Sequence, residues 1–213
     1  MKTLLATFGD SWTFGSELEN PQTDCWTAQL STEFSHVFNM SVPASSIGHI
    51  VVQLENLLSQ VKLDEFNQRV FVFGLTSSSR YLMFDNLKNE YVNVTSEAVY
   101  YTNTYNNGRP PDVAEHLLKF GNDFYRNIDH VKLQQHTVSQ VVAFLQAWCK
   151  QNNIQDIYMS YFEDQTFNQF VNTDKIINQG NSLNLAPEYF TDGRSHPNKE
   201  GHAYIASLVK AAL

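Results

Sequence analysis

The stretch LLATFGDS, residues 4–11, decides the fold class of this chain. Its five mainly apolar residues, stopped by Gly-Asp, predict a short buried strand followed by a sharp turn. A second run of the same kind, RVFVFGL, covers residues 69–75. Continuous apolar runs of this length are typical of parallel strands that are covered by helices on both faces.

Apolar residues recur at helical spacing between and after these strands. The clearest stripe steps by three and four from Ile47 to Val61, which predicts an amphipathic helix with Ser45 or Ser46 as its N-cap. Other elements are expected as helices over residues 24–34, 138–149 and 204–212 and as strands over residues 37–42 and 154–161. This order of elements predicts one three-layer α/β/α domain over residues 1–213, built on an open parallel sheet.

Residues 81–130 break this rhythm and are expected to form an insertion. The stretch is rich in Asn and Tyr and contains the turn Gly-Arg-Pro-Pro at 108–111. It is too long for a simple connection, and a helix is expected over 113–125. Two interpretations stay open, namely a surface excursion packed by its own aromatic side chains and a wall of the substrate site.

The composition argues against several classes of partner. The 213 residues are 42% hydrophobic and 17% charged, with a net charge of −8. An acidic chain lacks the basic face that neutralises nucleic-acid phosphates or anionic lipids. No apolar run approaches the roughly 18 residues of a membrane-spanning helix. We therefore expect neither nucleic acid nor membrane as a partner, and the oligomeric state stays open.

Cys25 and Cys149 are expected as buried thiols. Two distant cysteines without a CxxC partner make neither a disulfide framework nor a zinc site. The apolar stretch at residues 4–8 is too short for the hydrophobic region of a signal peptide. The cytoplasm is therefore the default location, with release by another route left open.

Ser11 stands where a nucleophile is expected. It follows the first predicted strand, and ligands of open α/β sheets bind beyond the carboxyl ends of the strands. Gly9 lets the backbone turn sharply, and Ser11 can begin a helical turn whose free N–H groups face an anionic oxygen. On this tripeptide alone, Ser11 as a helix N-cap is the favoured alternative.

The segment DGRSHPN, residues 192–198, supplies a candidate base near the other end of the chain. A serine hydroxyl needs a base to take its proton, and an imidazole does so near neutral pH. His196 is that base here, and Asp192 can orient its ring. The alternative is plain helix capping by Asn198. The two segments indicate a hydrolase more strongly together than apart.

Four segments in order resemble the SGNH hydrolases, also called the GDSL family of esterases and lipases. They are FGDSWTFG at 8–15, NMSVPA at 39–44, FVFGLTSSSR at 71–80 and DGRSHPN at 192–198. The resemblance implies a flavodoxin-like sheet, Ser11 as nucleophile, His196 as base and Asp192 as acid. It implies no metal or organic cofactor, and the histidines show no metal-ligand spacing.

Two positions that hold the oxyanion in this family are changed. A glycine is replaced by Ala44, whose backbone N–H survives, and an asparagine by Thr76, whose hydroxyl donates from a shorter side chain. Loss of one such donor costs on the order of 10²–10³ in rate. Ser77 and Ser79 are substitute hydroxyl donors.

Asp10, Gly74 and Arg80 complete the predicted surroundings of the oxyanion and substrate. Arg80 is a candidate cation near the developing charge, although a surface ion pair is the favoured interpretation. His49 is close to Ala44 in sequence, so a place in the lining of the site stays open, although a position on the surface of its helix is the favoured interpretation.

The last segment also departs from the family, since three residues rather than two separate Asp192 from His196. The longer spacing can move the carboxylate off the imidazole. Glu163 and Asp164 are alternative acids, although solvated surface positions are favoured for both.

These residues predict a serine esterase that hydrolyses a short-chain acyl ester, with O-acetyl on a carbohydrate as the favoured substrate. A small-molecule or glycan ester is the expected partner. Two alternatives stay open. The first is a non-catalytic carbohydrate- or ligand-binding module on the same fold, and the second is an O-acyltransferase, which the same triad permits.

Overall fold

The computed structural model describes residues 2–77, 80–86, 89–94, 99–101, 119, 123, 130–161, 167–177, 183, 185–190 and 196–213. Its main sheet has the strand order β2-β1-β3-β7-β8. The bounds are β1 Thr3–Phe8, β2 His36–Asn39, β3 Gln68–Leu75, β7 Gln155–Ser160 and β8 Ile176–Ile177. All neighbouring strands pair in parallel, which confirms the predicted open parallel sheet.

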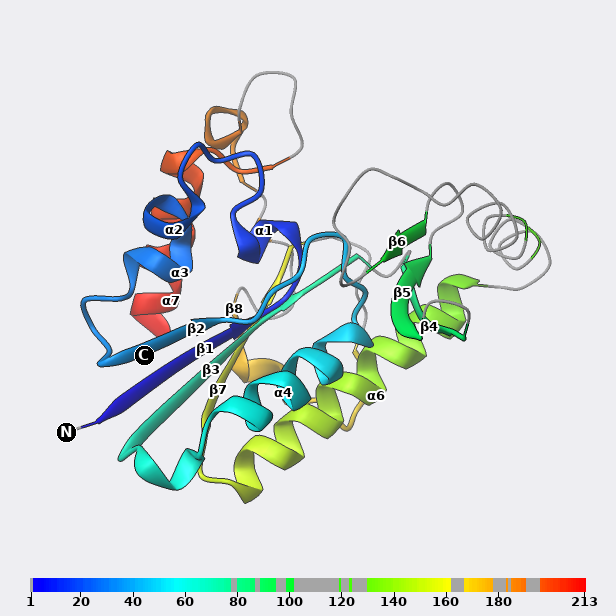
Figure 1. Cartoon of the computed structure of the whole chain (residues 1–213), viewed down its shortest axis with the longest axis horizontal. Helices are drawn as coiled ribbons and strands as arrows, with labels where there is room; N and C mark the ends of the chain where they lie inside the picture. The colour runs from blue at the N-terminus through cyan, green and yellow to red at the C-terminus, as the bar shows by residue number, and fades with distance from the viewer. Residues whose placement is uncertain are drawn as a thin grey trace.

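Helices cover both faces of this sheet (Figure 1). α4 (His49–Gln60) and α6 (His130–Gln151) lie on one face, and α3 (Trp26–Gln29) and α7 (Lys199–Ala212) on the other. In β3, Phe71 and Phe73 pack on the face that α4 and α6 cover, while Val70 and Val72 pack on the face that α3 and α7 cover. Since all four are fully buried, the strand has no polar face.

The predicted helix over residues 24–34 is wrong. Two short helices, α2 (Pro21–Asp24) and α3, meet at Cys25, whose extended backbone ends one and begins the other. The Cys25 thiol caps α3 by accepting a hydrogen bond from the N–H of Ala28 at 3.4 Å. Cys25 and Cys149 are both free and buried, as predicted.

α4 confirms the clearest helical stripe, but its predicted N-cap is wrong. The helix follows Gly48, and neither Ser45 nor Ser46 caps it. The Ser45 hydroxyl instead donates to the carbonyl of Gly9, 36 residues earlier in the chain. The serines therefore serve the loop before the helix rather than the helix itself.

Part of the insertion forms a second sheet that the sequence did not predict. β4 (Tyr81–Asp85), β5 (Glu90–Val94) and β6 (Val99–Tyr101) are antiparallel neighbours in that order. They lie beyond the carboxyl end of β3 (Figure 1). The helix predicted over 113–125 falls on a stretch outside the described residues, apart from residues 119 and 123.

Three short 3₁₀ helices complete the described elements, namely η1 (Leu63–Glu65), η2 (Thr173–Lys175) and η4 (Pro187–Tyr189). Among the residues that the structure describes, no helix is both long and apolar enough to cross a membrane.

Candidate active site

Ser11 is the first residue of α1 (Ser11–Phe14), directly beyond β1. The N-cap is Asp10, whose Oδ1 accepts a hydrogen bond from the N–H of Trp12 at 3.0 Å, so the alternative of Ser11 as N-cap is wrong. Ser11 is only 6% exposed. Within the described residues its backbone N–H has no acceptor, as the first turn of a helix requires.

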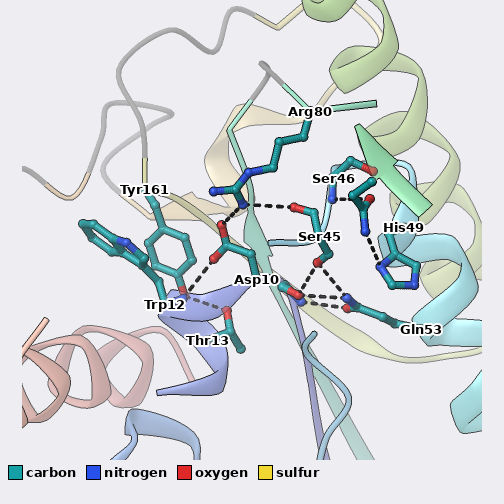
Figure 2. Close-up of polar contacts among 11 residues, drawn as sticks. Asp10, Trp12, Thr13, Ser45, Ser46, His49, Gln53, Arg80 and Tyr161 are labelled. Carbon is teal, nitrogen blue, oxygen red and sulfur yellow. Dashed lines mark hydrogen bonds and ion pairs between the residues drawn. The ribbon is translucent and has the colours of Figure 1, made fainter. Parts of the chain in front are cut away.

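The buried side-chain amide of Gln53, on α4, holds the turn before Ser11 (Figure 2). Its Nε2 donates to the Gly9 carbonyl and its Oε1 accepts from the Gly9 N–H, both at 2.8 Å. The Ser45 hydroxyl donates to the same carbonyl at 2.8 Å and accepts from Gln53 Nε2 at 3.0 Å. These bonds fix the loops after β1 and β2 against each other. The sequence indicates the role of Gln53 only through the position of this polar residue on the buried face of a helix.

Ala44 lies in the loop after β2 with φ of 62°, in the left-handed region. This conformation costs an L-residue about 1 kcal/mol, and glycine adopts it freely. The backbone thus keeps the shape expected at a position where the resemblance places glycine. In the described part of the chain, the Ala44 N–H donates to no acceptor.

Gly74 is required by close packing near the end of β3. A Cβ at this position would lie 2.7 Å from Cε2 and 2.8 Å from the hydroxyl of Tyr161. That hydroxyl is hydrogen-bonded to the hydroxyl of Thr13, on α1, at 2.9 Å. Gly74 therefore lets the nucleophile helix approach the sheet. Thr76 is buried one residue beyond β3.

Arg80 joins three segments of the site (Figure 2). Its Nη1 lies 2.9 Å from Asp10 Oδ2 and donates to the Ser45 carbonyl at 3.3 Å. The expected ion pair of Arg80 is confirmed, but its expected place on the surface is wrong, since the Arg80 side chain is 20% exposed and Asp10 is fully buried. Burial raises the pKa of Asp10, and the Arg80 charge opposes that rise.

His196 lies in the bend immediately before α7. The next residue, Pro197, pairs with Phe190, and the N–H of Asn198 donates to the Tyr189 carbonyl at 2.8 Å. Asn198 Oδ1 accepts from the N–H of Gly201 and caps α7, as the sequence predicted. The histidine loop is therefore anchored to η4.

Aromatic contacts connect the two ends of the chain. The ring of Trp12 lies 5.2 Å from that of Tyr161 and 5.7 Å from that of Phe190, measured between centroids. Phe190 also pairs with Pro197, the residue after His196, so these contacts connect the histidine loop to the helix that begins at Ser11. No hydrogen bond joins Ser11 to His196 in the described part of the chain.

Glu17 is the acid that contacts His196 within the described residues. Its Oε2 lies 3.2 Å from His196 Nδ1, and the side chains are 34% and 20% exposed. Nδ1 has no hydrogen-bond partner among the described residues, so this contact is a close approach that becomes an ion pair when the imidazole is protonated. Sequence reasoning missed Glu17, because a single acid after a glycine turn carries no motif. The predicted acid and its alternatives, together with one substitute hydroxyl donor, lie outside the described residues: Asp192, Glu163, Asp164 and Ser79.

Two further histidines are buried. His49 is on α4 but not on its surface, so that expectation is wrong. Its Nδ1 lies 3.4 Å from Nδ2 of Asn93, whose Oδ1 accepts from the N–H of Ser46 at 2.9 Å. Asn93 thus attaches the small sheet to the loop after β2. Burial lowers the pKa of both His49 and His202 to about 4.

One hollow, of about 340 Å³, lies at the β2 edge, with Phe14, Cys25, Thr27 and Asn39 among its lining residues. Neither Ser11 nor His196 lines it, so it belongs to the edge of the sheet rather than to the loops described above. Across the described residues, no three His, Cys, Asp or Glu side chains gather in a way that could hold a metal ion.

No protein-family model matches the chain, and no curated protein matches its sequence. Solved structures do match. TesA has 12% identity and a TM-score of 0.52, over 99% of this chain and 98% of that chain. A member of the lipolytic protein G-D-S-L family from Veillonella parvula DSM 2008 has 15% identity and a TM-score of 0.41, over 98% and 97%.

A two-domain esterase active on acetylated mannans has 12% identity and a TM-score of 0.46, over 99% of this chain and 48% of its own. The match to TesA confirms the α/β fold that the sequence predicts. The structures similar to this chain include lipolytic G-D-S-L proteins. At 12–15% identity, the likeness is one of fold.

Proposed function

We propose that the protein is a serine esterase, with Ser11 as nucleophile and His196 as general base and acid. One observation carries the proposal, namely that Ser11 begins a helix at the carboxyl end of β1 with its N–H unbonded among the described residues. An N–H group in this position can donate a hydrogen bond to the oxyanion that forms when the serine attacks a carbonyl carbon. The loop of His196 is connected to this helix by the contact of Phe190 with Trp12 and by the pairing of Phe190 with Pro197.

The reaction proceeds in two halves. Ser11 Oγ attacks the carbonyl carbon of the ester while its proton passes to Nε2 of His196. The tetrahedral intermediate collapses, the bond to the alcohol oxygen breaks, and that oxygen takes the proton from His196. Water then attacks the acyl-enzyme with His196 again as base, which releases the acid and restores Ser11.

Three donors are proposed for the oxyanion, namely the N–H groups of Ser11 and Ala44 and the hydroxyl of Thr76. The two N–H groups lack acceptors within the described part of the chain, and Ala44 keeps a glycine-like backbone. Asp10 and Arg80 hold the loops that carry these donors, through the ion pair and the bond to the Ser45 carbonyl. Asp192 is the carboxylate that the sequence motif proposes for orienting the imidazole.

The proposed substrate is a short-chain ester, with an acetyl group on a carbohydrate as the favoured case. The small sheet supports this choice through an exposed pair of aromatic rings, Phe84 and Tyr91, whose centroids are 5.3 Å apart. Sugars stack on such rings through their apolar faces. The Asn93 contact to Ser46 attaches this sheet to the loop that carries Ala44, which supports the insertion as a wall of the site.

A binding module on the same fold is the second candidate. It is favoured by the absence of a hydrogen bond between Ser11 and His196 in the described residues and by Thr76 at the asparagine position. Transfer of the acyl group to a sugar hydroxyl instead of water would use the same residues and the same acyl-enzyme.

Hydrolysis of p-nitrophenyl acetate and butyrate tests the proposal. We expect turnover by the wild type and a loss of about 10³-fold or more in both Ser11→Ala and His196→Ala. Matched controls are Ser59→Ala and His136→Ala, which change an exposed serine and an exposed histidine on α4 and α6. Equal turnover by wild type and Ser11→Ala would contradict the esterase and favour the binding module.

A further inference from the structure

We propose that Glu17 is the carboxylate that orients His196, in place of Asp192, which the sequence motif predicts for this role. The inference rests on the proposed esterase function. Glu17 acts through the imidazole and is therefore a positioning residue.

The contact is made at the correct ring nitrogen. Glu17 Oε2 lies 3.2 Å from His196 Nδ1. A carboxylate at Nδ1 holds the proton there and leaves Nε2 to accept the proton of the serine. The ring N–H is not yet directed at the carboxylate, which is common in substrate-free sites, where catalytic hydrogen bonds tighten only once substrate is bound.

The turn that carries Glu17 is tied to the nucleophile itself. Gly15 and Ser16 both donate their N–H groups to the Ser11 carbonyl at 3.0 Å, and Leu18 donates to the Gly15 carbonyl at 3.3 Å. Within this turn Glu17 has φ of 70°. Such a backbone costs a non-glycine residue about 1 kcal/mol and persists where its surroundings impose it, often at functional sites. The turn that ends α1 thus also places the carboxylate of Glu17 next to His196.

Among the residues that the structure describes, the other ionisable groups near His196 are already engaged. Both carboxylate oxygens of Asp10 are bonded, one to the Trp12 N–H and the other to Arg80. His202 Nδ1 accepts from the N–H of Trp26 at 3.2 Å, and burial keeps that ring neutral at pH 7. Glu17 is therefore the described acid whose charge is directed to Nδ1. The longer spacing between Asp192 and His196 also weakens the motif's own choice.

The test compares Glu17→Gln, Glu17→Asp, Asp192→Asn and the control Glu19→Gln, which changes an exposed acid two residues further on. The first readout is the pH profile of kcat/KM for p-nitrophenyl acetate. We expect Glu17→Gln to lower kcat by on the order of 10²–10⁴ and to move the acid limb to lower pH. Glu17→Asp should recover part of the loss. Asp192→Asn and Glu19→Gln should stay within about threefold of wild type.

The second readout is an NMR titration of the His196 ring, which needs no turnover. The ring signals should titrate at lower pH in Glu17→Gln and at the wild-type pH in Asp192→Asn, because only the first variant removes the adjacent charge. If Asp192→Asn shifts the titration and Glu17→Gln does not, the inference is wrong, even where loss of turnover in Ser11→Ala upholds the esterase. If Ser11→Ala keeps full turnover, the esterase fails, and the titration still shows which acid faces His196.

Discussion

Around Ser11 the loops are joined by buried hydrogen bonds, whereas the acid that contacts His196 forms a partly exposed pair with it. On the first side, the Gln53 amide, the Ser45 hydroxyl and the Asp10–Arg80 pair connect the ends of β1, β2 and β3. On the second side, Glu17 and His196 are both partly exposed. The difference fits their proposed tasks, since oxyanion donors act through fixed positions while a base must exchange protons.

The largest expected change in stability comes from removing the buried hydrogen bonds of Gln53. Gln53→Ala removes the acceptor of the Gly9 N–H in the core and opens a void, while the Gly9 carbonyl keeps the Ser45 hydroxyl and the Val42 N–H as donors. An unsatisfied buried N–H costs about 1–3 kcal/mol and the void adds to that cost, so we expect the free energy of unfolding to fall by about 4 kcal/mol. The control Gln60→Ala removes an exposed glutamine of the same helix and should cost under about 0.5 kcal/mol. Urea unfolding measures both, and equal costs would contradict the network.

The next effect is the pH dependence of stability to which His202, on α7, contributes. Burial lowers the pKa of His202 from 6.5 to about 4, so the unfolded chain binds a proton that the folded chain refuses across this window. The free energy of unfolding should therefore fall by up to about 3 kcal/mol as the pH falls from about 6.5 to 4. Above that range the contribution of His202 to the free energy of unfolding is constant. His49 adds a second contribution of the same sign.

The variant His202→Asn should have a shallower stability slope over this pH window, measured by urea unfolding at several pH values. His136→Asn, at an exposed position on α6, should keep the wild-type slope. Identical slopes in all three proteins would mean that His202 titrates normally in the fold.

A smaller effect is expected where β3 meets the nucleophile helix. Gly74→Ala places a methyl group 2.7 Å from the Tyr161 ring, and overpacking of this kind costs about 2 kcal/mol. Gly48→Ala is the matched control, because the nearest atom to its Cβ, on Leu82, would lie at an ordinary 3.4 Å. Thermal unfolding should separate the two. A loss in Gly48→Ala as large as in Gly74→Ala would contradict the packing.

The smallest effect has the opposite sign. Ala44→Gly removes the left-handed strain at Ala44 and should stabilise the fold by up to about 1 kcal/mol. Ala203→Gly, at an exposed position within α7, should instead destabilise it by about 1 kcal/mol. Loss of stability in both variants would show that Ala44 is not strained.

The parallel sheet could be predicted well from the sequence, because strands that are buried on both faces consist of unbroken runs of apolar residues. Short elements were predicted poorly. The helix over residues 24–34 is broken at Cys25, and a four-residue helix leaves too few positions for a periodic signal. The antiparallel sheet of the insertion was missed among its many polar and aromatic residues.

Candidate site residues in recognisable segments were found, and those that act through tertiary contacts were not. Ser11 and His196 stand in motifs at opposite ends of the chain. Gln53 and Glu17 have no motif, and their contacts join positions 44 and 179 residues apart. Arg80 was singled out, but its buried partner depends on how the ends of β1 and β3 meet. Such pairings follow from the fold rather than from spacing.

Covalent labelling is the measurement that shows whether Ser11 is an activated nucleophile. The protein is incubated with a fluorophosphonate, its intact mass is measured, and the modified peptide is mapped. We expect one phosphonate on Ser11 in the wild type, much slower labelling in His196→Ala and none in Ser11→Ala. An unlabelled wild type, or equal labelling of wild type and Ser11→Ala, would contradict the proposed role of Ser11.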